Sequence, residues 1–378
     1  MINLLIAGYH GFGNCGDEAI LKAMTKNIRN MAKDVSITAL SYRPEFTKTE
    51  YNIDSVDRFN FIGVLSAIRK SDIILSGGGT LLQDGTSTRS LLYYLAIIKF
   101  GKLFGKKVML YANGIGPVNG SFNRKLVKRI VNTVDVITLR EKLSEADLRN
   151  IGVNKPDITV TADPAFGLDS VSDEEALKLL KKEGLTLKKK PWVGVSVRAW
   201  NKAYDGEDYV LKLAKACDEI IKTGKELVFI PMEFPKDVEF SKKVASLMKQ
   251  KPHILKNRYN PSQILGIIGQ MDVMLSMRLH ALIFAAVKNV PMLGIIYDPK
   301  VEYYIKELDM IEAGDVRSER LDPKKIASLT CKVWENIDLY KQRLKLRADI
   351  MAGKARENDI LLEKQIACIR AYKKGKSK

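Results

Sequence analysis

Residues 271–300 read MDVMLSMRLHALIFAAVKNVPMLGIIYDPK and decide the fold class. The apolar run at 272–276 is long enough for one buried strand, 281–288 is typical of a helix, and 291–297 is typical of a second buried strand. A strand, a helix and a further strand in this order predict a parallel βαβ unit. Ligands of open α/β sheets bind at the carboxyl ends of such strands.

Charged side chains follow both of these strands. Arg278 and His280 stand between the first strand and the helix, and Lys300 follows the second strand. A helix N-terminus favours anions, and an arginine adds a bidentate donor for phosphate or carboxylate. We therefore expect these three residues to converge on one small anion, although a histidine at a helix start can also serve only as a cap.

The same alternation of strand, loop and helix recurs along the chain. Further strands are expected at 2–7, 35–40, 71–75, 107–112, 135–139, 192–197 and 226–230. This pattern predicts doubly wound parallel sheets, and 378 residues are too many for one typical core. We expect an N-terminal domain over 1–170, a linker at 171–190, a second domain over 191–320, and C-terminal helices with a basic tail at 321–378.

The charge balance restricts the choice of partner. The net charge is +18 and the pI is near 9.5, so a nucleic acid, an anionic membrane surface or a phosphorylated substrate would be attracted. No nucleic-acid recognition pattern appears, and we expect no such partner. Residues 341–378 hold 12 Lys and Arg against 4 Asp and Glu, which favours anionic lipid; the last six residues are expected to be disordered.

The cysteines and histidines exclude some classes of site. Four scattered cysteines, with no CxxC pair and no signal peptide, favour a reduced, cytoplasmic protein. Three histidines without metal-ligand spacing predict no metal site.

The linker is expected to end in the exposed run Lys188, Lys189 and Lys190.

A glycine loop follows the first strand. Gly11, Gly13 and Gly16 match the dinucleotide pattern GxGxxG, but Asp17 and Glu18 put negative charge where a pyrophosphate would lie. Two interpretations remain. The acids stabilise the start of the next helix, or the loop admits a neutral sugar whose hydroxyls Asp17 accepts.

Other strand ends also carry candidate site residues. Three glycines, 77–79, follow one strand and allow a ligand to approach the backbone. Arg140 follows the strand at 135–139 in the position that Arg278 has later in the chain, and Arg198 follows the strand at 192–197.

Six motifs in order carry a family resemblance. They are GYHGFGNCGDEAIL from Gly8, SGGGTLLQD from Ser76, NGIGP from Asn113, ADPAF from Ala162, SVRAW from Ser196 and SMRLHALIFA from Ser276. Together they resemble the polysaccharide pyruvyl transferases, most closely the bacterial CsaB type, from residue 2 to about 310.

The resemblance implies a fold and a reaction. The fold would be GT-B-like, with two Rossmann-like doubly wound domains facing a cleft. The reaction would transfer the enolpyruvyl group of phosphoenolpyruvate to a sugar of a lipid-linked precursor. Its product would be a 4,6-pyruvate ketal on N-acetylmannosamine of a secondary cell-wall polysaccharide, the ligand of S-layer anchoring domains. No cofactor is implied. From the scattered cysteines and the basic C-terminus we expect the enzyme in the cytoplasm, with a peripheral location at the inner membrane face.

Site residues follow from the resemblance and from the strand ends. The resemblance assigns donor binding to Arg140, His280 and Lys300, and a histidine is a residue type that suits a proton donor. The further expected residues are Arg278 and Arg198 for the donor, and Asp17, Asn14, Gly78 and Gly79 for the acceptor.

Two alternatives stay open from the sequence. A GT-B glycosyltransferase that uses a nucleotide-sugar would add a ribose-binding acid in the second domain, for which Glu233 is a candidate. A non-catalytic polyanion-binding protein would need only the positive charge, and its affinity would fall with salt for every ligand.

Overall fold

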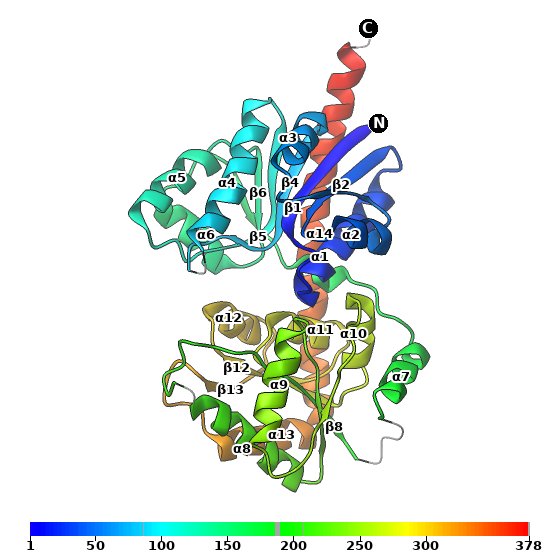
Figure 1. Ribbon diagram of the computed structural model, residues 1–378, viewed down its shortest axis with the longest axis vertical. Helices are drawn as coiled ribbons and strands as arrows, with labels where there is room; N and C mark the ends of the chain where they lie inside the picture. The colour runs from blue at the N-terminus through cyan, green and yellow to red at the C-terminus, as the bar shows by residue number, and fades with distance from the viewer. Residues whose placement is uncertain (86, 186–189, 207, 377–378) are drawn as a thin grey trace. The chain divides into compact units, whose positions relative to one another are not determined.

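The computed structural model describes the chain except for residues 86, 186–189, 207 and 377–378 (Figure 1). The chain forms two compact units. The first comprises Met1–Phe12, Asp17–Gly167 and Met351–Lys378, and the second comprises Gly13–Gly16 and Leu168–Ile350. The predicted exposed run at Lys188 and Lys189 lies outside the described residues.

The first unit is built on a parallel sheet. In its described residues the sheet has seven strands in the order β3-β2-β1-β4-β5-β6-β7. The strands are β1 Ile2–His10, β2 Val35–Ser41, β3 Asp54–Asp57, β4 Ile73–Leu82, β5 Lys107–Ile115, β6 Val136–Leu139 and β7 Ile158–Val160. The order reverses between β1 and β4, so the carboxyl ends of these two strands form the topological switch point where such sheets bind ligands.

Helices cover both faces of this sheet, which explains the continuous apolar runs of its strands. Leu4 and Ile6 of β1 pack in one cluster, and Leu5 and Ala7 pack in the other. The first cluster includes residues of α1 and α14, and the second includes residues of α3, α4, α5 and α6. The helices are α1 Cys15–Met31, α2 Pro44–Tyr51, α3 Phe61–Lys70, α4 Thr88–Leu103, α5 Ser121–Val131, α6 Lys142–Ile151 and α14 Ile337–Lys376.

Helix α14 starts in the second unit and ends in the first (Figure 1). Asn358 is fully buried there; it accepts a hydrogen bond from Thr161 Oγ1 at 2.8 Å and donates to the Ala162 carbonyl at 3.1 Å. The sequence predicts disorder from residue 373, but this prediction is wrong up to Lys376. Lys373 forms an ion pair with Asp72 at 2.7 Å, which holds this end of the helix on the unit.

The second unit repeats the same architecture. Its described residues form a sheet of six parallel strands in the order β10-β9-β8-β11-β12-β13. The strands are β8 Trp192–Ser196, β9 Glu226–Phe229, β10 His253–Ile254, β11 Val273–Ser276, β12 Met292–Ile296 and β13 Ile311–Asp315. The order reverses between β8 and β11, and this is the switch point of the unit.

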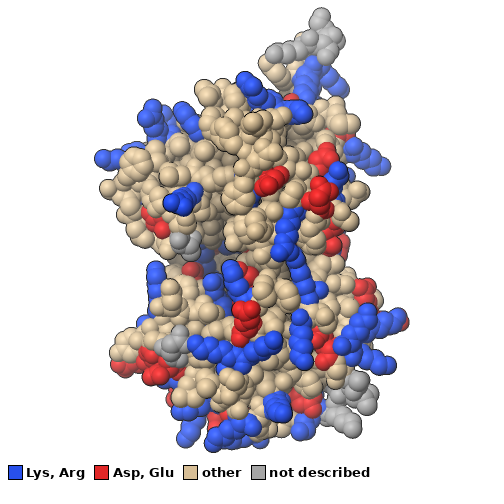
Figure 2. All heavy atoms as spheres, viewed as in Figure 1, with Lys and Arg blue, Asp and Glu red and all other residues tan. Residues whose placement is uncertain are grey.

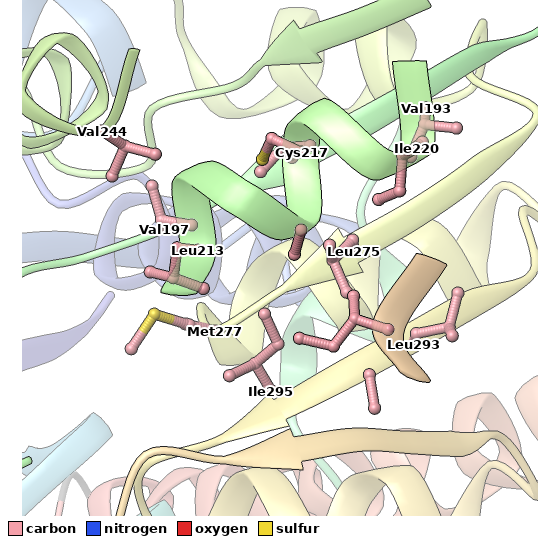
Figure 3. Close-up of a cluster of buried hydrophobic side chains, with 14 of the residues drawn as sticks. Val193, Val197, Leu213, Cys217, Ile220, Val244, Leu275, Met277, Leu293 and Ile295 are labelled. Atoms are coloured by element: carbon pink, nitrogen blue, oxygen red, sulfur yellow. The ribbon is translucent and has the colours of Figure 1, made fainter. Parts of the chain in front are cut away.

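The core of the second unit joins these strands to helices. Figure 3 shows side chains of α8 Asp208–Lys222, such as Leu213 and Ile220, gathered with Leu275 of β11 and Leu293 of β12. The other helices of the unit are α7 Asp173–Lys182, α9 Lys236–Ser246, α10 Pro261–Ile268, α11 Leu279–Val287, α12 Pro299–Glu307 and α13 Pro323–Glu335. The 3-10 turn η1 Pro164–Gly167 precedes the unit.

The segment predicted as a linker contains helix α7. Ser172 caps the helix, and Ala176 is among the residues that the helix buries. The Val171 N–H donates to the Ser262 carbonyl of α10 at 3.2 Å. Helix α7 therefore packs on the second unit, and Lys190, the described residue of the predicted lysine run, is exposed.

Candidate functional site

The switch point of the second unit collects most of the predicted cations. Arg198 follows β8, Arg278 and His280 follow β11, and Lys300 follows β12. These three strands are neighbours in the sheet. Their carboxyl ends lie along one edge, so the fold brings these residues to the same edge of one unit.

His280 occupies the first turn of α11 and is half-buried. Most of the helix behind it is fully buried, which fixes the backbone that carries the imidazole. Gly16 lies against the ring, and a Cβ on this glycine would overlap it. The glycine therefore makes room for the imidazole.

Arg278 has a different environment from the one predicted. The residue is only 8% exposed, and its guanidinium donates to Glu233 Oε2 at 3.0 Å and pairs with Asp237. Burial opposes the charge, but the Asp237 carboxylate raises the pKa of Arg278 above its ordinary value. Its charge thus contacts protein carboxylates in this structure.

The two carboxylates are part of one arrangement with the loop before α9. Asp237 Oδ2 accepts from the N–H groups of Met232 and Glu233 at 3.0 and 2.9 Å. Burial acts against the charge of Glu233, but a hydrogen bond from Lys236 and the charge of Arg278 lower the pKa of Glu233. Arg278 therefore fixes the start of α11 to this loop.

Arg198 and Lys300 are more accessible than Arg278. Arg198 is half-buried, donates to Tyr297 Oη at 3.1 Å, and has its guanidinium 5.0 Å from the centre of that ring. Lys300 is half-buried in the first turn of α12, where its N–H donates to Asp298 Oδ1 at 2.8 Å. Both cations lie where a ligand anion can reach them.

The glycine loop is divided between the units. Gly13–Gly16 belongs to the second unit: the Cys15 N–H donates to the Met232 carbonyl at 2.7 Å, and the Phe234 N–H donates to Gly13 at 3.1 Å. Asn14 forms an antiparallel bridge with Glu233, and its Oδ1 accepts from the Gly16 N–H at 3.0 Å. These contacts place Asn14 beside the Arg278 ion pairs.

Glu18 explains why the glycine pattern is not a dinucleotide loop. Its Oε1 accepts from the Gly11 N–H at 2.7 Å, and its Oε2 accepts from Tyr51 Oη at 2.7 Å. The carboxylate thus binds a backbone amide of the loop that a pyrophosphate would use.

The switch point of the first unit brings together three predicted acceptor residues. Asp17 is 9% exposed at the start of α1. Gly78 and Gly79 have φ values of 79° and 109°, and a Cβ on Gly79 would lie 2.6 Å from Asp17 Oδ1. A side chain at either position would be strained, and at Gly79 it would collide with the carboxylate.

Arg140 lies in the first unit and is 3% exposed. It pairs with Asp163 at 2.6 Å and with Glu141 at 3.2 Å, and it donates to Thr80 Oγ1 at 3.1 Å. The motif residue Asp163 is thus the partner of Arg140.

Two buried residues near this switch point were missed by sequence reasoning. His10 is fully buried, and burial together with the charge of Arg58 lowers the pKa of His10 to about 3. Arg58 is 6% exposed, donates to the Gly8 carbonyl at 3.2 Å, and stands 4.5 Å from the centre of the Tyr93 ring. Arg58 follows β3, a strand whose sequence DSVD gives no apolar signal.

Two kinds of feature are absent from the part of the chain that the structure describes. There, no group of three or more His, Cys, Asp and Glu side chains is arranged to hold a metal ion. Likewise, none of the described helices combines the length and the apolar character needed to cross a bilayer.

Solved structures resemble this chain over nearly its whole length. S. aureus MnaA with UDP has a TM-score of 0.67 at 13% identity and covers 96% of this chain and 95% of its own. HepE from Anabaena, in complex with UDP and glucose, has a TM-score of 0.62 at 10% identity, with coverage of 98% and 100%. At such identity the likeness shows the fold, which is of the GT-B type with two Rossmann-like domains.

The sequence comparisons are more specific. No curated protein gives a significant match. The family model described as "Polysaccharide pyruvyl transferase" matches residues 14–299. This match covers well over half of the chain and includes the second half of the glycine loop, Arg140, Arg198, Arg278 and His280. The protein belongs to the polysaccharide pyruvyl transferase family.

Proposed function

We propose that this enzyme transfers the enolpyruvyl group of phosphoenolpyruvate to a sugar of a lipid-linked cell-wall polysaccharide precursor. The product is a 4,6-pyruvate ketal on N-acetylmannosamine, as in the CsaB type, and phosphate is released. The observation that carries the proposal is the position of His280 on the same sheet edge as Arg198 and Lys300, in a chain of this family. A donor with a carboxylate and a phosphate needs a proton donor and more than one cation at the same place.

The reaction balances without a cofactor. A proton added to the methylene carbon of phosphoenolpyruvate leaves a cation at C2, which one sugar hydroxyl attacks. Departure of phosphate regenerates a cation at C2, and the second hydroxyl closes the ketal. The two hydroxyls release two protons, of which the methyl group takes one and phosphate takes the other.

Each residue has a role in this proposal. His280 protonates the methylene carbon, and Lys300 and Arg198 bind the phosphate and the carboxylate. Arg278 holds the start of α11 through Glu233 and Asp237, so it positions His280. We retain Arg140 as a donor-binding residue, and Asp17, Asn14, Gly78 and Gly79 as the acceptor-binding set.

Phosphate release provides the test. Purified protein is mixed with phosphoenolpyruvate and a lipid-linked disaccharide that contains N-acetylmannosamine. We expect phosphate to be released only when both substrates are present, with one ketal formed for each phosphate. Phosphoenolpyruvate alone is the control. If no acceptor of this kind supports release, the proposed reaction is wrong.

The nucleotide-sugar alternative makes a different prediction. It requires an acid that is available to a ribose, and Glu233 is already paired with Arg278 and with Lys236 at 2.6 Å. Calorimetry with UDP-N-acetylglucosamine and with phosphoenolpyruvate separates the two functions. Binding of the first ligand without the second would favour the glycosyltransferase.

We also retain the anionic membrane surface as a partner, with the enzyme at its cytoplasmic side. The basic C-terminus is one candidate for this contact. Two of its cations already have partners, since Arg370 pairs with Asp34 and Lys373 pairs with Asp72. Fewer positive charges therefore remain for lipid than the sequence alone implies.

A further inference from the structure

The helices α3, α4 and α5 of the first unit form a layer whose sequence is free of acidic residues. Residues 85–134 contain nine Lys and Arg and no Asp or Glu, in a chain with 44 acidic residues in 378. Helix α3 adds Arg69 and Lys70, again without an acid. Figure 2 shows Lys and Arg side chains over the part of the first unit where α4 and α5 lie.

Large apolar side chains share the outer surface of this layer with the cations. On α3, Ile62 and Arg69 are seven residues apart and therefore lie on one stripe, with Ile62 79% exposed. On α4, Leu92, Lys99 and Leu103 share the outer stripe, and Leu103 is 67% exposed.

Helix α5 continues this pattern. Phe122, Lys125 and Arg129 share its outer stripe, and Phe122 is 66% exposed. Each of the three helices thus presents at least one exposed apolar side chain and one cation. We call these eight residues the basic apolar face.

The three helices lie side by side, so the basic apolar face is one surface. The rings of Phe61 in α3 and Phe100 in α4 are 6.5 Å apart. Asn123 of α5 donates to Thr88 Oγ1 of α4 at 3.4 Å. Exposed apolar groups that are gathered on one surface mark an interaction site more often than scattered ones do.

Three acidic residues close to the layer in the sequence are engaged elsewhere. Asp135 pairs with Lys102 at 2.7 Å and with Lys107 at 3.0 Å. Asp72 pairs with Lys373, and Asp84 accepts from the N–H groups of Asn119 and Gly120. These carboxylates do not neutralise the cations on the outer stripes.

We propose that the basic apolar face docks on an anionic lipid bilayer. Lys and Arg attract anionic headgroups, while Ile62, Leu103 and Phe122 enter the boundary between headgroups and acyl chains. Nucleic acid is less suitable, because Ile62, Leu92 and Leu103 cannot stack on bases as aromatic rings do. The proposal differs from binding by the basic C-terminus, and it does not depend on the proposed reaction.

The test is cosedimentation of the full chain with lipid vesicles, without substrate. The vesicles contain phosphatidylcholine with phosphatidylglycerol, or phosphatidylcholine alone. We expect binding to the anionic vesicles at low salt. A variant with Lys99→Gln, Lys125→Gln and Arg129→Gln is expected to bind about 100-fold more weakly. A variant with Ile62→Ser, Leu103→Ser and Phe122→Ser is expected to lose the binding that survives high salt.

Matched controls lie in the second unit, where Leu177, Leu247, Lys215 and Lys242 are exposed. Changing these leucines to Ser and lysines to Gln is expected to leave vesicle binding unchanged. Wild-type binding by either variant of the basic apolar face would overturn the proposal. So would loss of binding on truncation after Ala371 alone, or salt-sensitive binding of RNA through these residues without any binding to vesicles.

Discussion

The imidazole of His280 lies against Gly16, so closely that a Cβ at residue 16 would overlap the ring. The backbone of Gly16 does not adopt a left-handed conformation, so space alone excludes a side chain there. The glycine loop and the start of α11 thus meet at the proposed proton donor. This contact explains why residue 16 is a glycine without any role in phosphate binding.

We predict that Gly16→Ala lowers turnover by displacing His280. A misplacement of about 1 Å in a catalytic group costs on the order of 100-fold in rate. The measurement is kcat for phosphate release from phosphoenolpyruvate. Gly353→Ala is the control, because this helical glycine has no atom within 4 Å of an added Cβ. Equal turnover in the two variants would show that the ring position does not matter.

We predict that His280→Gln lowers turnover by roughly 10²–10⁴-fold while phosphoenolpyruvate still binds. Glutamine keeps a similar size and hydrogen-bonding capacity but cannot deliver a proton as imidazolium does. Turnover is measured by phosphate release, and binding is measured by calorimetry. A variant with wild-type turnover would mean that His280 only shapes the pocket.

We predict that Arg278→Ala destabilises the second unit by about 3–5 kcal/mol, because it removes the buried cation that pairs with Asp237 and leaves Glu233 with only the exposed Lys236. All three tryptophans, Trp192, Trp200 and Trp334, belong to this unit, so their fluorescence during urea unfolding reports its stability.

Arg198→Ala is the matched control for this measurement. The arginine is half-buried and its hydrogen-bond partner is the hydroxyl of Tyr297, not a carboxylate, so a loss of about 1 kcal/mol is expected. If Arg278→Ala loses no more stability than this control, its ion pairs do not support the fold.

Local sequence patterns were sufficient to predict the strands and the helix that position His280 and Lys300 in the second unit. The apolar runs at 272–276 and 291–297 became β11 and β12, and the helix between them became α11. Their connection fixed which edge His280 and Lys300 occupy, because parallel strands end on the same side. These features depend on residues close together in the chain, so periodicity predicts them.

Features that depend on distant partners were not predictable in this way. Arg278 follows a strand in the position of an anion ligand, but its contacts are carboxylates 45 and 41 residues earlier in the chain. Nothing in the local sequence distinguishes Asn358 from other polar helix residues. Its buried position depends on hydrogen bonds with Thr161 and Ala162, almost 200 residues earlier in the chain. The sequence alone predicts the edge of the sheet at which a residue lies, whereas tertiary packing determines which group the side chain contacts.

The last prediction concerns His10 and acid stability. Burial, followed by the charge of Arg58, lowers the pKa of His10 in the folded state to about 3 from an ordinary value of 6.5. Between these pH values the unfolded chain binds a proton that the folded chain does not. The free energy of unfolding therefore falls as the pH drops below 6.5, by about 1 kcal/mol per pH unit from this group.

Hydrogen exchange at the amides of β1 and β4 measures this effect in the first unit, which contains no tryptophan. We expect protection of these amides to decrease between neutral pH and about pH 5 in the wild-type protein. His10→Gln removes the titrating group. The protection of these amides should therefore decrease less in this variant than in the wild-type protein, by the contribution of one proton. His253→Gln, at an exposed histidine, should keep the wild-type dependence. If His10→Gln and His253→Gln lose protection equally, the buried imidazole is not what makes this unit sensitive to acid.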